Sequence, residues 1–343
     1  MKPAIAIHRM HPRHVFRIAR GDRSFADVVF LRVEADGVRG YGEASPIAFY
    51  HETEQGVAKR LAGLRDFLDR LVIETVADIA AAWTAAWPLL DFSRAAQCAL
   101  DLALWDWLAR KKGCSVAELA HGHTARPVRS FCTIGLSTSE EFFAKVEELS
   151  EFAAIKIKSN SEPHLYDVEA VRQRSKAVIA IDANCAWGAL DLSALAHDLC
   201  GLDVAFIEQP YPPGDDGILR PREHALPIFA DESCVTESDV ERIPQRYDGF
   251  NVKLVKCGGL TPALRMLARG RAAGCGTMVG CMLESSLLIS AGLVAAQTTD
   301  YADLDGAWLL RDDPCPGMHF DRGLLQAAPG PGFGVQPPDA LFG

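Results

Sequence analysis

Five charged residues stand at or near the ends of short apolar runs and recur at almost one interval: Lys158, Asp182, Glu208, Asp231 and Lys253. The steps between them are 24, 26, 23 and 22 residues, about the length of one strand, one helix and two short loops. A barrel of such units gathers its strand ends around one opening. The spacing therefore predicts three carboxylates flanked by two lysines, which is a divalent-metal site with a base on either side.

The three acidic residues each end a run that is otherwise apolar: VIAID for Asp182, VAFIE for Glu208 and PIFAD for Asp231. One such acid is equally well explained as the N-cap of the helix that follows the strand. Three on successive strands favour a shared ion, and a set made only of carboxylates suits a hard cation, Mg²⁺ first and Mn²⁺ second. No histidine joins them, which disfavours zinc.

The lysines lie on strands whose period of two decides which side chains reach the pore. In the run AIKIK, Lys156 and Lys158 share one face. An isolated Lys-x-Lys is typical of a solvated edge strand, but inside a barrel two buried like charges need carboxylates or a catalytic task beside them. Lys253 and Lys256 are three residues apart, so we expect them on opposite faces, with Lys253 facing the pore because Lys256 adjoins a Gly-Gly turn.

Residues 1–122 are expected to form a smaller α+β capping domain. The run from Val28 to Glu34 is rich in β-branched and aromatic residues and leads into a turn at residues 35–37, which predicts a β-hairpin. From residue 54 to residue 109 the period becomes helical, and residues 93–109 place an apolar stripe on one helix with Ser93 as its cap. A sheet backed by helices is the result.

Residues 123–311 alternate short strands with helices, and residues 312–343 are rich in Pro and Gly. Eight strands and seven intervening helices predict an α/β fold, a modified TIM barrel of the (β/α)7β type whose last strand has no helix of its own. The tail should pack back on the capping domain. The expected barrel strands are Val128–Thr133, Ala153–Lys158, Val178–Asp182, Val204–Glu208, Pro227–Asp231, Phe250–Val255, Thr277–Cys281 and Tyr301–Asp305.

Composition narrows the class of partner. With 343 residues, 49% of them hydrophobic, the chain can bury a large core, and its net charge of −10 without a basic stretch argues against nucleic acid. No signal peptide or membrane helix is readable, and ten cysteines at irregular spacing without Cys-x-x-Cys predict reduced thiols. We therefore expect a cytoplasmic enzyme with a small-molecule substrate and no nucleic-acid or membrane partner. A homo-oligomer is possible.

The chain resembles the enolase superfamily, within its muconate-lactonizing-enzyme subgroup, in the segments AIKIK, IDAN, FIEQP, ADES, NVKLVKCGG and GCMLESS, and in GYGEASP of the capping domain. The match runs from about residue 15 to residue 310. The resemblance implies that Lys158 and Lys253 are the acid/base pair, and that Asp182, Glu208 and Asp231 bind the metal.

Within the subgroup, Asp303-Leu304-Asp305 is similar to the Asp-x-Asp of dipeptide epimerases, particularly the L-Ala-D/L-Glu type. By the strand period the two aspartates share a face, where free carboxylates attract a substrate ammonium group. A polar strand end is the alternative explanation. A dipeptide, with a carboxylate for the metal and an amine for the aspartates, fits this arrangement.

Three further residues are candidates for the substrate site. Residues 18–24 resemble the capping loop of the same epimerases, and Arg20 or Arg23 would meet an acidic second side chain, although loop arginines are more often simply solvated. Glu284 follows the seventh strand and would support Lys253 or the surroundings of the metal. An acid at a helix start explains Glu284 equally well.

The chemistry follows from the substrate. Removing a proton alpha to a carboxylate makes a dianionic enediolate, so positive charge must be concentrated there. A lysine acts as a base only if its pKa falls from about 10.4 towards neutrality, and both the metal and Lys156 would lower the pKa of Lys158. A second lysine on the opposite face returns the proton, which inverts the stereocentre by 1,1-proton transfer. Enolase-superfamily sites are a known example of a Lys or His base with Mg²⁺.

We therefore expect a metal-dependent dipeptide epimerase that inverts the alpha carbon of the C-terminal residue, acting on L-Ala-D/L-Glu or related dipeptides from peptidoglycan recycling. The alternatives are o-succinylbenzoate synthase with N-acylamino acid racemase activity and muconate cycloisomerase, which share the lysines and metal acids. Their substrates lack a free α-ammonium group, so the pair at residues 303 and 305 separates them from the epimerase. A non-catalytic barrel would predict damage to the acid/base set, and none is visible.

Overall fold

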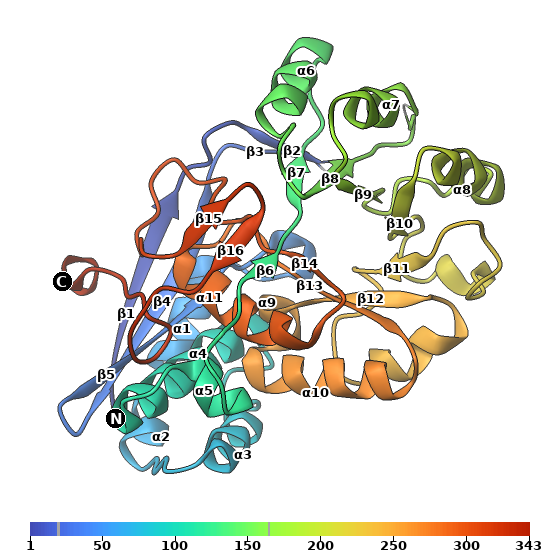
Figure 1. Ribbon diagram of the computed structural model, residues 1–343. Coiled ribbons are helices and arrows are strands. Elements are labelled where there is room, and N and C mark those ends of the chain that lie inside the picture. The colour runs from blue at the N-terminus through green and yellow to red at the C-terminus, as the bar shows by residue number, and fades with distance from the viewer. Residues whose placement is uncertain (19–20, 164) are drawn as a thin grey trace.

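The computed structural model describes residues 1–18, 21–163 and 165–343, in which a parallel barrel lies beside a smaller domain of antiparallel sheet and helices (Figure 1). The sheet has the order β1-β4-β5, formed by β1 (Lys2–Met10), β4 (Ala26–Ala35) and β5 (Val38–Ala44). Asp36 and Gly37 join β4 to β5 with φ of 54° and 71°, the left-handed backbone that a tight hairpin turn requires. The predicted hairpin is confirmed.

Helix α4 (Arg94–Lys112) packs closely against β5. A Cβ atom at Gly42 would lie 2.0 Å from the carbonyl oxygen of Ala99, and one at Gly40 would lie 2.4 Å from Trp107, so only glycine allows this approach. The predicted cap is present, because the Ser93 side chain accepts a hydrogen bond from the amide of Ala96. Instead of one apolar stripe, every residue from 95 to 109 is buried, because α4 lies between the sheet and the barrel.

Shorter elements complete this part of the chain. The short strands β2 (Phe16–Ile18) and β3 (Gly21–Arg23) pair antiparallel before β4. The remaining elements are η1 (Ala48–Tyr50), α1 (Glu54–Ala62), α2 (Arg65–Asp69), α3 (Val76–Ala86) and α5 (Val116–His121).

The barrel is an eight-stranded parallel sheet in the described part of the chain, with strands in sequence order from β7 to β14. It closes where the amide of Phe131 donates to the carbonyl of Ala302 (2.8 Å) and the amide of Leu304 donates to Ser130 Oγ (2.7 Å). The predicted α/β barrel class is confirmed. The strands are β7 (Cys132–Ile134), β8 (Ala154–Lys158), β9 (Val178–Asp182), β10 (Val204–Glu208), β11 (Ile228–Ala230), β12 (Gly249–Lys253), β13 (Gly276–Gly280) and β14 (Tyr301–Asp303).

Two of the seven expected helices are replaced by 3-10 helices. Between β10 and β11 the chain forms only η2 (Asp216–Ile218), and between β11 and β12 it forms η3 (Asp239–Gln245). Residues 210–227 contain five prolines, and Pro244 lies inside η3; proline lacks the amide hydrogen that a continuing α-helix needs. The other barrel helices are α6 (Ser139–Glu148), α7 (Leu165–Arg174), α8 (Leu192–Gly201), α9 (Leu254–Cys257), α10 (Leu260–Ala272) and α11 (Ser286–Ala295), with η4 (Ala296–Thr298) after α11.

The expected first barrel strand, Val128–Thr133, is split in the structure. Its beginning is β6 (Val128–Arg129), which pairs with β16 (Leu324–Gln326) in a separate sheet; β15 (His319–Asp321) is the third strand of that sheet. Only the end of the expected strand enters the barrel. The amide of Ser130 donates to Gly323 of the tail (2.8 Å), so competition from the C-terminal hairpin separates the two pieces.

The tail also contacts the first domain. The amide of Gly332 donates to the carbonyl of Cys114 (2.9 Å), and the amide of Phe333 donates to Asp106 (2.7 Å). Near the chain end, which carries η5 (Asp339–Phe342), Arg39 forms an ion pair with Asp339 (3.0 Å). Residues 312–343 therefore bridge the barrel and the antiparallel sheet.

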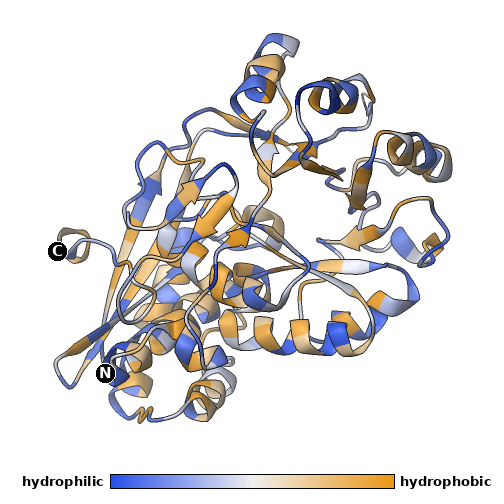
Figure 2. Cartoon of the chain, in the orientation of Figure 1, coloured by the Kyte–Doolittle hydropathy of each residue, from blue (hydrophilic) through white to orange (hydrophobic). Residues whose placement is uncertain are grey.

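One end of the barrel interior is apolar. Phe206, which projects inward, packs against Phe229 and Tyr301 at ring-centroid distances of 4.6 and 4.9 Å, and Phe131 packs on Phe206 at 5.7 Å. The hydropathy colours of Figure 2 show apolar residues on the strands and apolar inner faces on the surrounding helices. These rings fill the pore at the amino ends of the strands, so the polar groups of the pore collect at the carboxyl ends.

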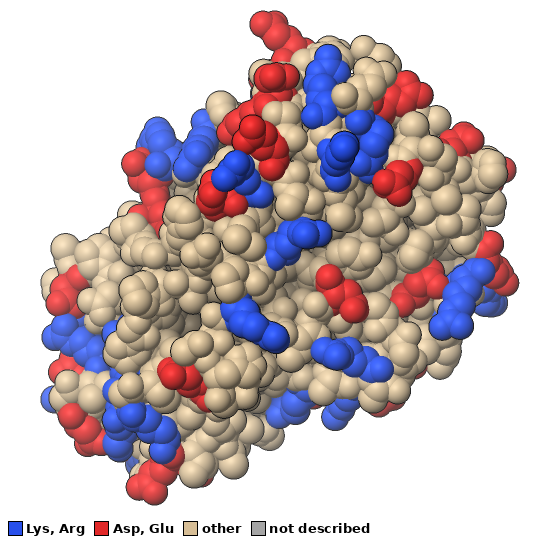
Figure 3. All heavy atoms as spheres, viewed as in Figure 1, with Lys and Arg blue, Asp and Glu red and all other residues tan. Residues whose placement is uncertain are grey.

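The surface carries charges of both signs, and the cysteines, all within the described residues, form no disulfides. On the face shown in Figure 3, basic and acidic side chains are interspersed. No helix in residues 1–18, 21–163 and 165–343 is long and apolar enough to cross a membrane. All ten cysteines are free, and seven of them are buried.

Candidate active site

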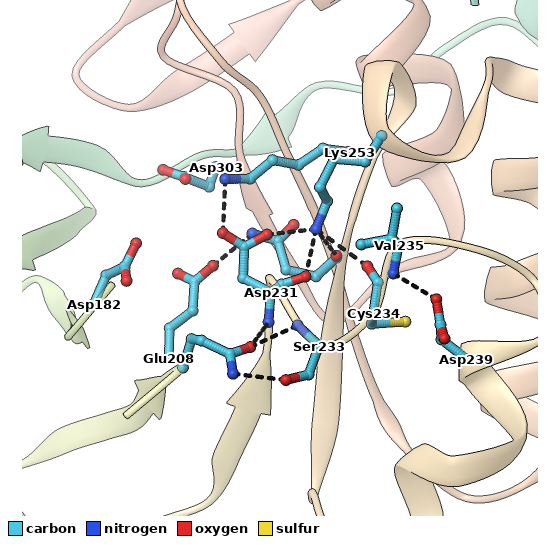
Figure 4. A network of polar contacts seen from close by, with 12 residues as sticks. Asp182, Glu208, Asp231, Ser233, Cys234, Val235, Asp239, Lys253 and Asp303 are labelled. Carbon is cyan, nitrogen blue, oxygen red and sulfur yellow. Dashed lines mark hydrogen bonds and ion pairs between the residues drawn. The ribbon is translucent and has the colours of Figure 1, made fainter. Parts of the chain in front are cut away.

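Three buried carboxylates meet at the carboxyl ends of adjacent strands. Asp182 ends β9, Glu208 ends β10 and Asp231 directly follows β11, and one oxygen of each lies within 4.8 Å of the others. Figure 4 shows them in a network with Lys253 and Asp303. The sequence spacing therefore brings the three acids together as expected.

The charge balance of this cluster fits a bound cation. Burial, together with the negative charges of Asp182 and Asp231, raises the pKa of Glu208 to about 7. Burial also acts against ionisation of Asp182, but Lys158 and Lys156 hold its pKa below the ordinary value. Three buried carboxylates whose oxygens lie this close together suit a divalent ion with oxygen ligands.

Two residues just beyond the strand ends and one inside β12 hold the carboxylates in place. Gln209, in the left-handed conformation at φ 39°, accepts hydrogen bonds from the amides of Asp231 (2.7 Å) and Ser233 (3.0 Å). Asn184 donates its amide to Asp182 (2.9 Å), and Asn251 donates its side chain to Glu208 (2.7 Å). Sequence reasoning did not assign these three residues, although IDAN and FIEQP were the visible signals.

Two lysines face the substrate cavity from opposite sides of the barrel. Lys158 donates to Asp182 (2.5 Å) and Lys253 donates to Asp231 (2.9 Å), and both line the cavity. They end β8 and β12, which are four strands apart in the eight-stranded order of the described residues. Lysines halfway round the barrel from each other can approach the two faces of a substrate carbon held between them.

Lys156 has a different environment. It is buried and does not line the cavity; its ammonium donates to Glu208 (3.1 Å) and to Asp303 and lies 3.7 Å from Asp182. Burial opposes its charge, but Asp303, Glu208 and Asp182 together raise its pKa well above the ordinary value. Lys156 therefore acts as a fixed positive charge beside Lys158, as the strand period predicts.

The expectation for Lys256 is wrong. We predicted that it would point away from the pore, but its ammonium donates to Asp231 Oδ1 (2.5 Å) and to three backbone carbonyls. The strand ends at Lys253 and α9 begins at Leu254, so the period of two no longer applies. Lys256 and Lys253 hold the two oxygens of Asp231, and their charges overcome its burial and lower its pKa.

Asp303 and Asp305 line the same cavity. Asp303 Oδ2 pairs with Lys156, and its buried Oδ1 has no hydrogen-bond partner among the described residues. Asp305, two residues past the end of β14, accepts a hydrogen bond from the amide of Thr133 (2.7 Å). Burial and the charge of Asp303 raise the pKa of Asp305 to about 6. The pair has negative charge in excess, which suits a substrate cation.

The cavity has a volume of about 320 Å³ and lies between the capping domain and the barrel mouth. Arg23, at the end of β3, lines it, whereas Arg20 lies outside the described residues. Glu284 does not line it. The Glu284 carboxylate accepts a hydrogen bond from the amide of Met282 (3.0 Å), and burial raises its pKa to about 8. Glu284 precedes α11 by two residues, so it shapes the loop after β13.

Glu43 connects the capping domain to the loop after β13. It lies in the segment GYGEASP, and the sequence assigned it no role of its own. Its carboxylate accepts hydrogen bonds from the amides of Ser285 (2.9 Å) and Leu288 (3.3 Å) and from the hydroxyl of Ser285. These amides belong to the N-terminus of α11, where no carbonyl within the helix is available. Ser45 also donates to the carbonyl of Leu283 (3.0 Å), a residue of the cavity wall. The capping domain thus positions one wall of the cavity.

Glu43→Gln is expected to change how stability depends on pH. Burial raises the pKa of Glu43 from 4.5 to about 7, so between these values the folded protein holds a proton that the unfolded chain has released. The free energy of unfolding of the wild type therefore falls, relative to the variant, as the pH rises through this range. The expected relative loss is about 2 to 3 kcal/mol between about pH 5 and pH 8. Urea unfolding measures it, and parallel pH profiles would contradict it.

Known proteins resemble the chain over nearly its whole length. Residues 2–120 match the mandelate racemase / muconate lactonizing enzyme N-terminal domain, and residues 141–341 match the enolase C-terminal domain-like family. An L-Ala-D/L-amino acid epimerase of Flavobacterium johnsoniae is 35% identical, with 98% of this chain and 99% of that protein covered. The L-Ala-D/L-Glu epimerase of Escherichia coli is 36% identical, with 92% and 96% covered. A dipeptide epimerase from Methylococcus capsulatus, crystallised with Mg and the dipeptide L-Arg-D-Lys, superposes with a TM-score of 0.86 at 30% identity, covering 98% and 99%.

Proposed function

The chain belongs to the mandelate racemase / muconate lactonizing enzyme family of the enolase superfamily, and from this premise we propose that it is a Mg²⁺-dependent epimerase of L-Ala-D/L-Glu and related dipeptides. Two relatives that cover more than nine tenths of the chain are an L-Ala-D/L-amino acid epimerase and an L-Ala-D/L-Glu epimerase. The observation that carries the proposal is the pair of lysines on β8 and β12, which face one cavity from opposite sides beside three clustered carboxylates.

In this proposal Asp182, Glu208 and Asp231 hold the metal. When bound, Mg²⁺ would neutralise charge that develops on the substrate carboxylate and would lower the pKa of the neighbouring lysines. In the structure the negative charges of Asp231 and Glu208 outweigh burial and raise the pKa of Lys253. Lys253 therefore becomes a base only when its pairing with Asp231 is weakened.

The two lysines then divide the proton transfer. Lys158 reaches one face of the alpha carbon of the C-terminal residue and Lys253 the other, because they stand on opposite sides of the cavity. One lysine takes the alpha proton to give an enediolate, and the other delivers a proton to the opposite face. Lys156, which stays charged, favours the anionic intermediate. The net result is inversion of one stereocentre. After the turnover the first lysine carries the proton and the second is neutral, and proton exchange with solvent or a turnover in the reverse direction restores the starting state.

The aspartates select the substrate. Asp303 has one carboxylate oxygen without a partner in the described chain, and burial and the negative charge of Asp303 raise the pKa of Asp305. A free α-ammonium group supplies that charge. The substrates of o-succinylbenzoate synthase, N-acylamino acid racemase and muconate cycloisomerase lack such a group, so the aspartates favour a dipeptide. We propose Arg23, in the cavity wall, as the partner of an acidic second side chain.

The setting of the reaction is also proposed. Ten free cysteines suit a reducing compartment, so we place the enzyme in the cytoplasm. There its dipeptides would come from turnover of peptidoglycan, a polymer that contains residues of both configurations.

A dipeptide library in deuterium oxide tests the function. The enzyme with Mg²⁺ should replace one hydrogen by deuterium in each dipeptide that it epimerises, because the returned proton comes from solvent. N-acetylated copies of the same dipeptides serve as the control and should gain no mass. Equal labelling of both sets, or labelling of neither, would contradict the proposal.

Removal of the metal is expected to abolish turnover and to lower the melting temperature. An ion that binds only the folded state stabilises it by about 2.7 kcal/mol at one hundred times its Kd. Thermal melts with EDTA and with increasing Mg²⁺ should therefore show a rise in Tm for the wild type and a much smaller rise for Glu208→Gln. An identical Mg²⁺-dependent rise in the two proteins would contradict the assigned ligand set.

A further inference from the structure

A second cavity adjoins the substrate cavity. It has a volume of about 410 Å³ and lies between residues 12–17, the face of α6 and Trp308. Phe16, Thr133 and Leu309 line both cavities. The two cavities therefore meet at these three residues, which form the partition between them.

The partition lies beside the residues that anchor the substrate ammonium in the proposed function. Thr133 donates its amide to Asp305 (2.7 Å), and Leu309 donates its amide to the carbonyl of Asp305 (3.0 Å). The α-carbon that bears the ammonium group also bears the side chain of the first residue. That side chain consequently starts within reach of the partition.

The walls of the second cavity consist of apolar side chains and of charged side chains that are mostly paired with one another. Val15, Leu136, Ala144 and Trp308 contribute apolar surface. The charged residues around them are paired: Arg17 with Glu141 (3.0 Å) and Lys145 with Glu148 (2.7 Å).

Arg13 is the remaining cation of this wall. Its side chain donates to the carbonyl of Leu310 (3.0 Å) and lies 5.2 Å from the Trp308 ring. It has no carboxylate partner in the described chain. A positively charged first side chain would therefore be repelled.

We propose that the second cavity receives the side chain of the first residue of the substrate, and that it favours large apolar side chains such as Leu and Phe. The inference rests on the proposed function, because the position of the ammonium group fixes where the side chain begins. It extends the substrate class from dipeptides that begin with alanine to dipeptides that begin with bulky apolar residues.

Ala144→Phe tests the proposal, because Ala144 lines only the second cavity. The control is Ala194→Phe, an exposed alanine on α8 that lines neither cavity. The kcat/KM is measured for dipeptides with L-Ala, L-Leu, L-Phe or L-Lys in first position and one fixed second residue. In the wild type, L-Leu and L-Phe should react within about tenfold of L-Ala, and L-Lys more slowly.

In Ala144→Phe the kcat/KM should fall about tenfold or more for L-Leu and L-Phe but less than about threefold for L-Ala, with no such split in Ala194→Phe. An equal fall for all substrates, or wild-type turnover of L-Ala dipeptides alone, would overturn the inference and leave the proposed function intact. Titration calorimetry of the same dipeptides gives a Kd for each protein without any turnover. If no dipeptide reacts, the proposed function fails, whereas the cavity is still judged by these Kd values.

Discussion

Lys158→Ala and Lys253→Ala should each lower the rate of epimerisation by about a thousandfold or more, since a positioned acid or base contributes roughly that factor. Each lysine faces the cavity from its own side of the barrel, at the ends of β8 and β12. Loss of either one leaves no group to complete the transfer on that face. Polarimetry on a dipeptide that the wild type epimerises measures the rate.

The two variants should differ from each other in proton exchange. The lysine that remains can still remove and return the alpha proton of one stereoisomer, so each variant should incorporate deuterium into only one of the two configurations. Lys176→Ala, an exposed lysine outside the cavity, is the matched control. Normal epimerisation in either catalytic variant would refute the two-base scheme, and exchange of both configurations would show that the lysines do not divide the faces.

Replacing Asp303 and Asp305 together by asparagine should lower kcat/KM for dipeptides by about a hundredfold or more, because a buried substrate ammonium would lose its charged partners. N-acetylated dipeptides, which have no ammonium group and which the wild type should not epimerise, should stay unreactive with the variant. Asp305→Asn alone is the cleaner variant, because Asp303 also pairs with Lys156. Asp312→Asn, at an exposed position outside the cavity, is the control.

Two measurements, the Mg²⁺-dependent melting temperature and the turnover of dipeptides, decide the prediction for Asp303 and Asp305. The Mg²⁺-dependent rise in melting temperature should persist in the double variant, because neither aspartate belongs to the cluster of Asp182, Glu208 and Asp231. Unchanged dipeptide turnover would reject the role as ammonium anchor. A loss of the Mg²⁺ response would show that the substitutions damage the metal site instead.

The positions of the site residues were predictable where regular strands carry them. The intervals of 22 to 26 residues between the five charges are set by one strand, one helix and two loops, and the structure gathers these charges at one barrel mouth. Lys156 and Lys158 share a face because β8 stays extended from Ala154 to Lys158.

The predictions failed where the chain leaves its strands. Lys256 reaches Asp231 because the strand ends at Lys253, two residues before the predicted end at Val255, and a helix begins at Leu254. The 3-10 helices between β10 and β12 follow from prolines whose effect the repeat count ignored. Gln209 holds Asp231 through a left-handed backbone, which depends on contacts between distant segments and leaves no periodic signal.

In the described part of the chain, the aromatic rings of Phe131, Phe206, Phe229 and Tyr301 fill the amino end of the barrel interior and leave the carboxyl end as its entrance. A barrel interior that is closed at one end has no separate exit, so the product must leave through the opening by which the next substrate enters. Because an epimerase acts on both configurations of one centre, substrate and product compete for the same opening. Each epimer should therefore act as a competitive inhibitor of the turnover of the other.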